Sequence, residues 1–472
     1  METATPARPV LASAGALLQA HALFLQHRDA EALPLACAAV DAMPRRPDAW
    51  TLLGVLQQRL GRALEAEAAY REATRVAPEY ADAWTNLGNL MSGRNDLRGA
   101  LLAFQQAMRC APASPDPAYN LGVALEHFGL WDGALAAFEA AVECDPRHVD
   151  ARWNGALALL RAGRFEEGFR EYEWRFQRGE PAPRAYPQPV WDGRQLAGRT
   201  ILVWAEQGFG DTLQFMRFVP EVARRGGRVA LEVMDGVQGL AQRMPGVADV
   251  ILRGIEPPPF DTHVALMSLP HVLGLDGPLA DARYLRAPDA LTGRWRDRLA
   301  AASHGQGRQL AVGLVWAGNP ALRNSHERSP GFEATSALLG VRGARFYSLQ
   351  KGAGRGELEG RALPANFVDL DADIASFDDT AAIIANLDVV VTCDTAVAHL
   401  AGALGKPVLT MLPHSRDWRY GFDPHASAWY PSMRLFRQAR RGDWTDVLSR
   451  VAHALEDAVA SMPMQALAPR HA

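Results

Sequence analysis

The stretch "CDTAVAHLAGALGKPV", Cys393 to Val408, follows the run Val389 to Thr392, whose β-branched residues predict a buried strand. The chain then passes through Asp394 and Thr395 straight into a helix built mostly of Ala and Gly. A helix that only had to pack could use Leu, Ile or Phe more freely. Small side chains at this turn therefore predict that another group comes close to the backbone.

The start of this helix is a candidate phosphate site, because exposed N–H groups and the helix dipole both favour an anion there. We expect Thr395, Ala396 and Val397 to offer the N–H donors. Asp394 would repel a phosphate, so we assign it to neutral hydroxyls of a ribose or sugar. In the alternative interpretation Asp394 only caps the helix, and the small residues reflect tight packing. His399 joins the donor-binding candidates, although a lone histidine one turn into a helix is more often a structural partner.

Composition indicates a soluble globular protein of several domains. The chain has 472 residues, of which 48% are hydrophobic and 22% charged, and its formal net charge of -4 gives no general affinity for nucleic acid or anionic membranes. The N-terminal run Val10 to Leu25 predicts an amphipathic helix rather than a signal peptide, and no apolar run is long enough for a membrane span. The cysteines lack metal-ligand or disulfide spacing, so we expect no metal site and a cytoplasmic location. They are Cys37, Cys110, Cys144 and Cys393.

A period of 34 residues runs through the first third of the chain. Small residues would let two helices approach, an aromatic ring would fill the gap, and proline would end the second helix. The pattern resembles the tetratricopeptide repeat, with three clear units at about residues 47–148, a degenerate unit before them and a partial unit after them. The columns are Pro44, Pro78, Pro112 and Pro146; Gly54, Gly88 and Gly122; Ala66, Ala100 and Ala134; and Tyr70, Phe104, Phe138 and Tyr172.

An asparagine column shares this period, at Asn86, Asn120 and Asn154. It falls on the first helix of successive hairpins, the helix that lines the concave face of such arrays. Amide side chains can hydrogen-bond an extended peptide backbone whatever its sequence, so the column predicts a peptide-binding ladder. The alternative is that these asparagines only cap or link neighbouring helices.

The proline-rich stretch "GEPAPRAYPQPVWDG", Gly179 to Gly193, marks a boundary. After it, short apolar strands alternate with helical patterns, which predicts two parallel sheets in tandem with a ligand cleft at their carboxyl ends. The first sheet is expected to contain Ile201 to Trp204, Val229 to Val233 and Val250 to Leu252. The second is expected to contain Leu310 to Trp316, Phe346 to Gln350, Phe367 to Leu370, Val389 to Thr392 and Val408 to Leu412.

The loop "EQGFGDTLQ" follows the first strand of the first sheet and contains Gly208, Gly210 and Asp211. It is neither a Walker A loop nor a complete dinucleotide fingerprint, because no Gly-Lys-Ser/Thr follows and Leu213 stands at the third glycine position. One interpretation is that Asp211 only caps the helix. In the other, its carboxylate is a general base at the mouth of the cleft and the glycines give an acceptor room to approach.

The second sheet opens with "GLVWAGNPALRNSHERSPGFE", which places Asn319 and Arg328 in a polar loop after the strand. "FYSLQKG" places Gln350 and Lys351 at the end of the next strand. Cationic side chains at this edge suit a diphosphate, since a guanidinium offers paired donors that do not titrate. A solvated basic loop is the plainer alternative.

Taken in order, "GFGD", "GLVWAGNP", "YSLQKG", "DTAVAHLAGALGKPV" and "DWRYG" resemble the heptosyltransferase-like glycosyltransferases of the GT-B fold, in the bacterial subgroup with tetratricopeptide repeats. The overall plan is similar to that of the O-GlcNAc transferases. The resemblance implies an inverting, metal-independent transfer from a nucleotide-sugar, with no cofactor. It makes Asp211 the base and Arg328 the residue that stabilises the leaving diphosphate. Asn319, Gln350 and Lys351 join Asp394 to Val397 on the donor side.

The sequence also departs from these families. Ala396 stands where heptosyltransferases often have glycine, and no counterpart of the paired histidines of O-GlcNAc transferases is present. The expected fold is an α-helical tetratricopeptide solenoid followed by an α/β GT-B fold of two facing Rossmann-like domains. The expected divisions are a repeat array at 1–180, a linker at 181–199, an acceptor-side domain at 200–304, a nucleotide-sugar domain at 305–435, and a helix at 436–472 that crosses back to the first Rossmann-like domain.

Three functions stay open on the sequence. The first is a glycosyltransferase acting on a protein held by the repeats, for example a surface protein such as flagellin. The second acts on lipopolysaccharide or another glycan, with the repeats docking a partner. The third is a catalytically inactive scaffold. No nucleic-acid partner is expected, and the nucleotide, sugar and acceptor are not disclosed by the sequence.

Overall fold

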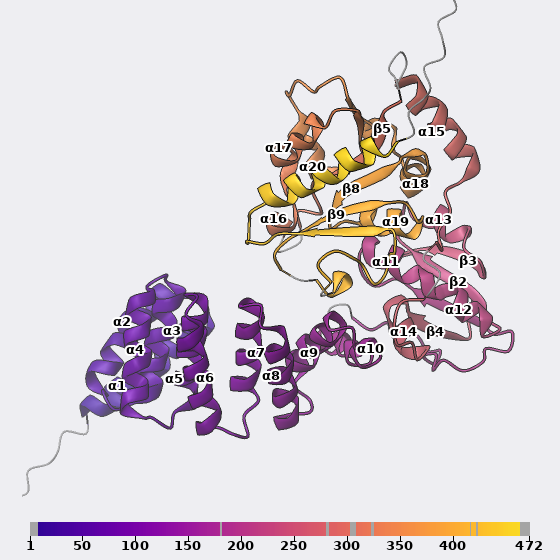
Figure 1. Cartoon of the computed structure of the whole chain (residues 1–472). Coiled ribbons are helices and arrows are strands. Elements are labelled where there is room, and N and C mark those ends of the chain that lie inside the picture. Colours follow the sequence, from indigo (N-terminus) through magenta and orange to yellow (C-terminus); the bar gives the residue numbers. More distant parts are fainter. Residues whose placement is uncertain are drawn as a thin grey trace, which may run out of the picture. The chain divides into compact units, whose positions relative to one another are not determined.

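The computed structural model describes residues 8–179, 182–279, 283–302, 308–321, 325–415, 417–421 and 423–462. The chain divides into two compact units, Met1–Ala158 and Leu159–Ala472. The first unit is entirely helical, and the second contains two parallel sheets (Figure 1). None of the helices in the described ranges combines the length and the hydropathy that crossing a bilayer requires.

The first unit is a stack of helical hairpins, as the 34-residue period predicts (Figure 1). Its glycine column works as expected: a Cβ added to Gly88 would lie 2.8 Å from the ring of Phe104, and one added to Gly122 would lie 2.5 Å from Phe138. The helices are α1 (Arg8–Leu25), α2 (Asp29–Ala42), α3 (Pro47–Arg59), α4 (Ala63–Val76), α5 (Ala81–Gly93), α6 (Leu97–Cys110), α7 (Asp116–His127), α8 (Trp131–Cys144) and α9 (Val149–Arg161), which runs into the second unit.

The second unit begins before the α/β sequence does, because α10 (Phe165–Tyr172) packs into its aromatic core. The ring of Phe169 lies 5.9 Å from the rings of both Phe215 and Trp418. The repeat pattern therefore extends further along the chain than the compact helical unit. The segment that follows, expected as the 181–199 linker, lies along the first sheet: the Trp191 N–H donates to the His263 carbonyl at 2.8 Å.

The first sheet has the strand order β3-β2-β1-β4 and is parallel throughout. Three of its strands match the expected ones, and β4 was not predicted. The strands are β1 (Thr200–Trp204), β2 (Arg228–Val233), β3 (Val247–Leu252) and β4 (Thr262–Ala265). The accompanying helices are α11 (Phe209–Phe215), α12 (Val219–Arg224), α13 (Gln238–Gln242) and α14 (Leu269–Val272).

The second sheet has the order β10-β9-β8-β5-β6-β7 and is also parallel. All five expected strands are present, and β10 is additional. The strands are β5 (Leu310–Val315), β6 (Ala344–Ser348), β7 (Phe367–Asp369), β8 (Val389–Cys393), β9 (Val408–Leu412) and β10 (Met433–Arg437). The helices are α15 (Asp289–Ala302), α16 (Ser325–Arg328), α17 (Gly331–Thr335), α18 (Phe377–Asn386), α19 (Ala396–Ala403) and α20 (Thr445–Ala460).

The C-terminal helix does not cross back to the first Rossmann-like domain, so that prediction is wrong for the described residues. Val447, Val451 and Leu455 of α20 are fully buried in the core of the second sheet, which also contains Leu310 and Phe346. Their spacing of four residues gives α20 one apolar stripe. A short connection from β10 to α20 lets that stripe cover the nearest sheet, which is the second (Figure 1).

Candidate functional site

Two strand-to-helix turns meet in the second unit. The turn after β1 leads into α11 of the first sheet, and the turn after β8 leads into α19 of the second. A Cβ added to Gly210 would lie 3.0 Å from the His399 ring and 3.8 Å from the Ala396 Cα. The glycine of the "GFGD" loop therefore allows the first turns of α11 and α19 to touch, and the two sequence motifs form one site.

Asp211 forms an ion pair across this contact with Arg419. Its second oxygen accepts from the Gly208 N–H at 3.2 Å, so it also caps α11, as the alternative interpretation predicted. Arg419 Nη1 lies 3.1 Å from Asp417, which gives the guanidinium two carboxylate partners. Burial alone would raise the pKa of Asp417, but the charge of Arg419 beside it holds that pKa below its ordinary value. The predicted base thus belongs to a charged triad.

Asp394 forms a second charged group on the other side of the contact. Its side chain is 6% exposed, pairs with Arg328, and accepts from the Tyr420 hydroxyl at 2.8 Å. Burial lowers the pKa of Arg328 while the Asp394 carboxylate raises it, and the net shift is upward. In this structure both oxygens of Asp394 are engaged by protein, so a donor hydroxyl would have to share or displace one of these partners.

The helix start beside Asp394 has the features of an anion site. Thr395 is the N-cap residue of α19, with φ −141° and ψ 170°, and no side chain caps this helix. Thr395 and Ala396 are half-buried, whereas Val397 is buried. Among the described residues the N–H groups of these three have no acceptor, as expected for the first turn of a helix. Arg328, whose Nη2 also lies 3.4 Å from the Asp394 carbonyl, places a cation beside this helix start.

Other predicted donor-side residues are held in structural roles. Gln350 is buried, and its Oε1 accepts from the backbone N–H groups of Trp316 and Ala317 at 3.1 and 2.9 Å. Lys351 Nζ lies 2.8 Å from an Asp371 carboxylate oxygen and also donates to a neighbouring backbone carbonyl. Both side chains therefore already have protein partners, and their donor-binding role stays a prediction.

Asn319 and His399 complete the predicted set. Asn319 is exposed, and its Oδ1 accepts from the Ala321 N–H at 3.0 Å, which forms a small turn after β5. His399 is buried, and its Nδ1 lies 3.1 Å from the Tyr430 hydroxyl. Burial lowers the pKa of His399 to about 4. It is therefore a neutral packing residue between α11 and α19, the role that a lone histidine on a helix usually has.

The asparagine column lies on α5, α7 and α9 of the repeats, the first helix of each hairpin. The Nδ2 groups of Asn86 and Asn120 each donate at 2.8 Å to the carbonyl four residues earlier, whereas Asn154 Nδ2 lies 3.4 Å from the Tyr119 hydroxyl. All three are half-buried. Part of their bonding capacity is used within the array, and each Nδ2 retains one further N–H.

Arg419, Asp417 and Tyr420 were not predicted as site residues. They lie together around the short 3-10 helix Trp418–Tyr420, about two hundred positions after Asp211. The sequence signal for these residues was the stretch "DWRYG". It was part of the family resemblance, but no role was assigned to its residues. In this stretch an acidic and a basic residue stand on either side of Trp418, and Gly421 follows soon after. That pattern could have identified the three residues as part of the site.

A further charged cluster closes the first sheet at the point where its strand order reverses, between β1 and β4. The fully buried Arg175 donates to Glu206 at 3.0 Å and to Ser268 Oγ at 2.7 Å, and it pairs with Glu173 at 2.6 Å. Burial raises the pKa of Glu206 to about 7, against the opposing effect of Arg175. The chain's own arginine therefore fills the crevice in which open α/β sheets usually hold a ligand.

Comparison with known proteins supports both the description of the repeat array and that of the α/β region. Residues 51–115, 85–148 and 119–181 match the tetratricopeptide repeat, and residues 367–440 match glycosyltransferase family 9 (heptosyltransferase). The family 9 match covers β7 to β10 and includes Asp394, Thr395 and Arg419. The chain thus joins tetratricopeptide repeats to a glycosyltransferase family 9 region, and its parallel sheets with flanking helices have a GT-B arrangement.

One curated relative is the protein FlbA of Caulobacter vibrioides, which is 30% identical over 340 residues. The match covers 64% of this chain and 54% of FlbA, so the chain spans about half the length of that relative. Among solved structures, MamA of Desulfovibrio magneticus RS-1 is 14% identical, covers 38% of this chain and 100% of its own, and has a TM-score of 0.33. The tetratricopeptide protein TTC0263 of Thermus thermophilus is 22% identical, with coverages of 35% and 90% and a TM-score of 0.31. Scores this low add no weight to the assignment.

Proposed function

We propose that the protein transfers a sugar from a nucleotide-sugar to an acceptor hydroxyl, with inversion and without a metal. One observation carries the proposal: the loop of the first sheet that contains Asp211 contacts the first turn of α19 through Gly210, and Arg328 pairs with Asp394 just before that turn. In the reaction, the acceptor oxygen bonds to the sugar carbon, its proton passes to Asp211, and the bond from that carbon to the diphosphate breaks. The charge that appears on the diphosphate is then met by protein groups.

The protein groups proposed to stabilise the diphosphate are the N–H groups of residues 395–397 and the guanidinium of Arg328. Preorganised donors of this kind contribute a few kcal/mol each to a transition state, about 2.7–4 for one oxyanion-type donor. Arg419 connects the two sides. Because Arg419 pairs with one oxygen of the Asp211 carboxylate, we propose that the donor diphosphate attracts Arg419 and frees that oxygen for the acceptor proton.

The catalytic proposal is tested with Asp211→Asn, which preserves the size of the side chain and removes its basicity. We expect kcat to fall by about 10²–10⁴-fold, the range for loss of a general base. Binding of nucleoside diphosphate should stay within a few-fold. The matched control is Asp235→Asn, which removes an exposed carboxylate after β2 of the same sheet and should have wild-type activity. Equal activity of Asp211→Asn and the control would remove Asp211 from the mechanism.

The donor is sought with a thermal-shift screen of UDP, GDP, CDP and ADP. A ligand that binds only the folded state raises the unfolding temperature by mass action. At least one diphosphate should do so, and Thr395→Pro, which alters the helix start, should abolish its effect. If wild-type protein binds no nucleotide at all and hydrolyses no nucleotide-sugar, the scaffold alternative replaces the enzyme.

The acceptor is proposed to be a protein that the repeats hold, with a surface protein such as flagellin as one candidate. Support comes from the asparagine column, whose amides lie on one helix of each hairpin and are only half-buried. The test is the triple change of Asn86, Asn120 and Asn154 to Ala, with Gln105→Ala on α6 as control. Polypeptide acceptor affinity should fall by more than about tenfold in the triple variant alone. Unaltered affinity, with activity on a glycan, would favour the glycan-transferring alternative.

A further inference from the structure

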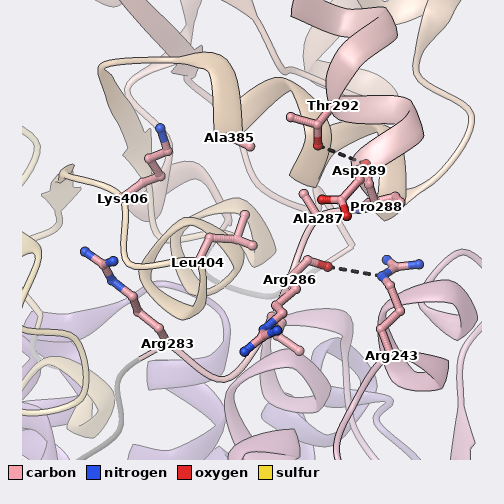
Figure 2. Close-up of a pocket in the computed structure, with 11 residues that line it drawn as sticks. Arg243, Arg283, Arg286, Ala287, Pro288, Asp289, Thr292, Ala385, Leu404 and Lys406 are labelled. Atoms are coloured by element: carbon pink, nitrogen blue, oxygen red, sulfur yellow. Dashed lines mark hydrogen bonds between the residues drawn. The ribbon is translucent and has the colours of Figure 1, made fainter.

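A hollow of about 680 Å³ lies in the α/β unit, away from the site described above (Figure 2). Its size is that of a small-molecule site. Four cationic side chains line it, from Arg243, Arg283, Arg286 and Lys406, whereas Asp289 is the one carboxylate in the lining among the residues that the structure describes. The whole chain has a formal net charge of -4, so this concentration of positive charge is local.

The position of the hollow separates it from the proposed transferase cleft. Lys406 precedes β9, and Ala385 lies near the end of α18, just before β8. Both therefore lie at the amino edge of the second sheet, whereas Asp394 follows β8 at the carboxyl edge. Arg243, by contrast, follows α13 of the first sheet. The hollow is thus built from both α/β halves, on the side opposite the candidate active site.

The cations are placed by specific contacts. Gly405 has φ +71°, and a Cβ there would lie 2.3 Å from Arg283 Nε, so this glycine lets the Arg283 side chain lie across the end of α19. Lys406 Nζ donates to the Leu387 carbonyl at 2.9 Å. Arg243 Nε donates to the Arg286 carbonyl at 3.2 Å, which ties the connecting segment to the first sheet (Figure 2).

Two described carboxylates outside the lining, those of Asp378 and Asp388, also lie near the cations of the hollow. Asp378 pairs with Arg243. Asp388 accepts from the Ala311 N–H at 2.8 Å and so is held at the start of β5. Burial lowers the pKa of Lys406, and the charge of Arg283 lowers it further, against the opposite effect of Asp388. An anion bound between Lys406 and Arg283 would offset the repulsion between these two like charges.

We propose that this hollow binds a soluble anion with at least two phosphate charges, and that the bound anion links the two α/β halves. The arginine forks suit phosphate oxygens, and the recess suits a diphosphate-bearing small molecule rather than a flat membrane surface. Binding here is independent of the donor site, since no residue is shared. A ligand that holds both halves would restrict any movement of one against the other.

The test uses the full chain with inorganic pyrophosphate as the probe. Binding is measured by titration calorimetry at physiological ionic strength and located by hydrogen exchange. Wild-type protein should show slower exchange in 283–292 and 404–408 when pyrophosphate is added. The double change Arg283→Ala/Arg286→Ala should abolish this protection and weaken that binding by more than about tenfold. Both side chains are exposed, so folding should be preserved.

The matched control is Arg294→Ala/Arg296→Ala on α15, which removes the same charge from exposed positions that do not line the hollow. If pyrophosphate slows hydrogen exchange in the control variant as much as in wild-type protein, the result supports the site. Equal losses in both double variants would show that general charge attraction is responsible, and would overturn the proposal. Protection confined to 394–398 would also overturn it while supporting the donor site. Binding to phosphatidylglycerol vesicles without binding of free pyrophosphate would replace the soluble ligand by a lipid headgroup.

Discussion

The two parallel sheets reverse their strand order at comparable points, but the chemistry at these points is opposite. In the first sheet, between β1 and β4, Arg175 is fully buried and satisfies Glu206 and Ser268. In the second, between β5 and β8, the pair of Arg328 and Asp394 lies beside a helix start whose N–H groups have no acceptor in the described part of the chain, and the Arg328 side chain is 28% exposed. One crevice is filled by the chain's own arginine, whereas the arginine at the other is partly exposed.

This difference indicates that the two similar sheets have different roles. A fully buried ion pair fixes structure, and it is costly to break because the remaining charge stays desolvated. A partly exposed pair at a helix start can exchange partners with an incoming phosphate. In the proposed function, the first sheet therefore contributes Asp211 and a rigid frame, whereas the second contributes the groups proposed to bind the donor. Three measurements test this division.

The largest effect on stability is expected for Arg175→Ala. It leaves Glu206 buried without its cation, and we expect a loss of about 3–5 kcal/mol in the free energy of unfolding. Denaturant unfolding of the full chain provides the measurement. The double variant Arg175→Ala/Glu206→Gln should recover part of this loss, because it removes the unpaired charge. A loss below about 1 kcal/mol, typical of exposed pairs, would show that the first crevice is not closed as tightly as its geometry indicates.

Arg328→Ala should have the reverse pattern, with a larger effect on turnover than on folding. We expect kcat to fall by about 10²-fold, because one cation that meets the leaving diphosphate is lost. Arg328→Lys should retain part of the activity, since it keeps the charge and loses the paired donors. Steady-state kinetics and unfolding curves of the same preparations give both quantities. If Arg328→Ala destabilises the fold as much as Arg175→Ala and leaves nucleotide affinity unchanged, the two crevices do not differ in task.

The smallest effect is a pH dependence that arises where α11 and α19 touch. The pKa of His399 is lowered to about 4 in the folded state, below the ordinary value of 6.5. Between these values the unfolded chain binds the extra proton, so the stabilising contribution of neutral His399 is complete above about pH 6.5 and is lost as the pH falls toward 4. The slope is about 1.4 kcal/mol per pH unit at most.

His399→Gln isolates this contribution, because Glu206 acts in the opposite direction. The raised pKa of Glu206, about 7, stabilises the fold at low pH and loses this contribution as the pH rises from 4.5 to 7. The difference in unfolding free energy between wild type and His399→Gln should therefore shrink by about 1–2 kcal/mol from pH 6.5 to pH 5. A difference that does not depend on pH would mean that His399 stays accessible to protons in the folded protein.

Much of the fold was predictable, since its signals are local and repeated. The glycine and aromatic columns of the repeats predicted the contact between Gly88 and Phe104, because both residues lie within one hairpin. The long strands of the second sheet are continuous apolar runs, typical of strands buried on both faces. The strands β4 and β10 were missed. β4 has only four residues, and in β10 two arginines interrupt the apolar pattern.

The candidate site was predictable only in its parts. Asp211, Arg328 and Asp394 follow recognisable strands or belong to motifs, so the sequence could propose them. The partner of Asp211 could not be found in this way, because Arg419 lies in a different sheet's loop far along the chain. Gln350 and Lys351 show the converse: their positions at a strand end were predicted well, but their side chains bond to backbone or to Asp371.

The sequence by itself determined the repeat array, the two alternating α/β halves, and the small residues of "CDTAVAHLAGALGKPV" at the start of a helix. These features depend on spacing within a few dozen residues, so the chain records them directly. Only the tertiary structure decided that Asp211 pairs with Arg419, that Arg175 fills the first crevice, and that α20 covers the second sheet. Each of these joins residues distant in sequence, and burial and charge compensation in the folded protein select the partners.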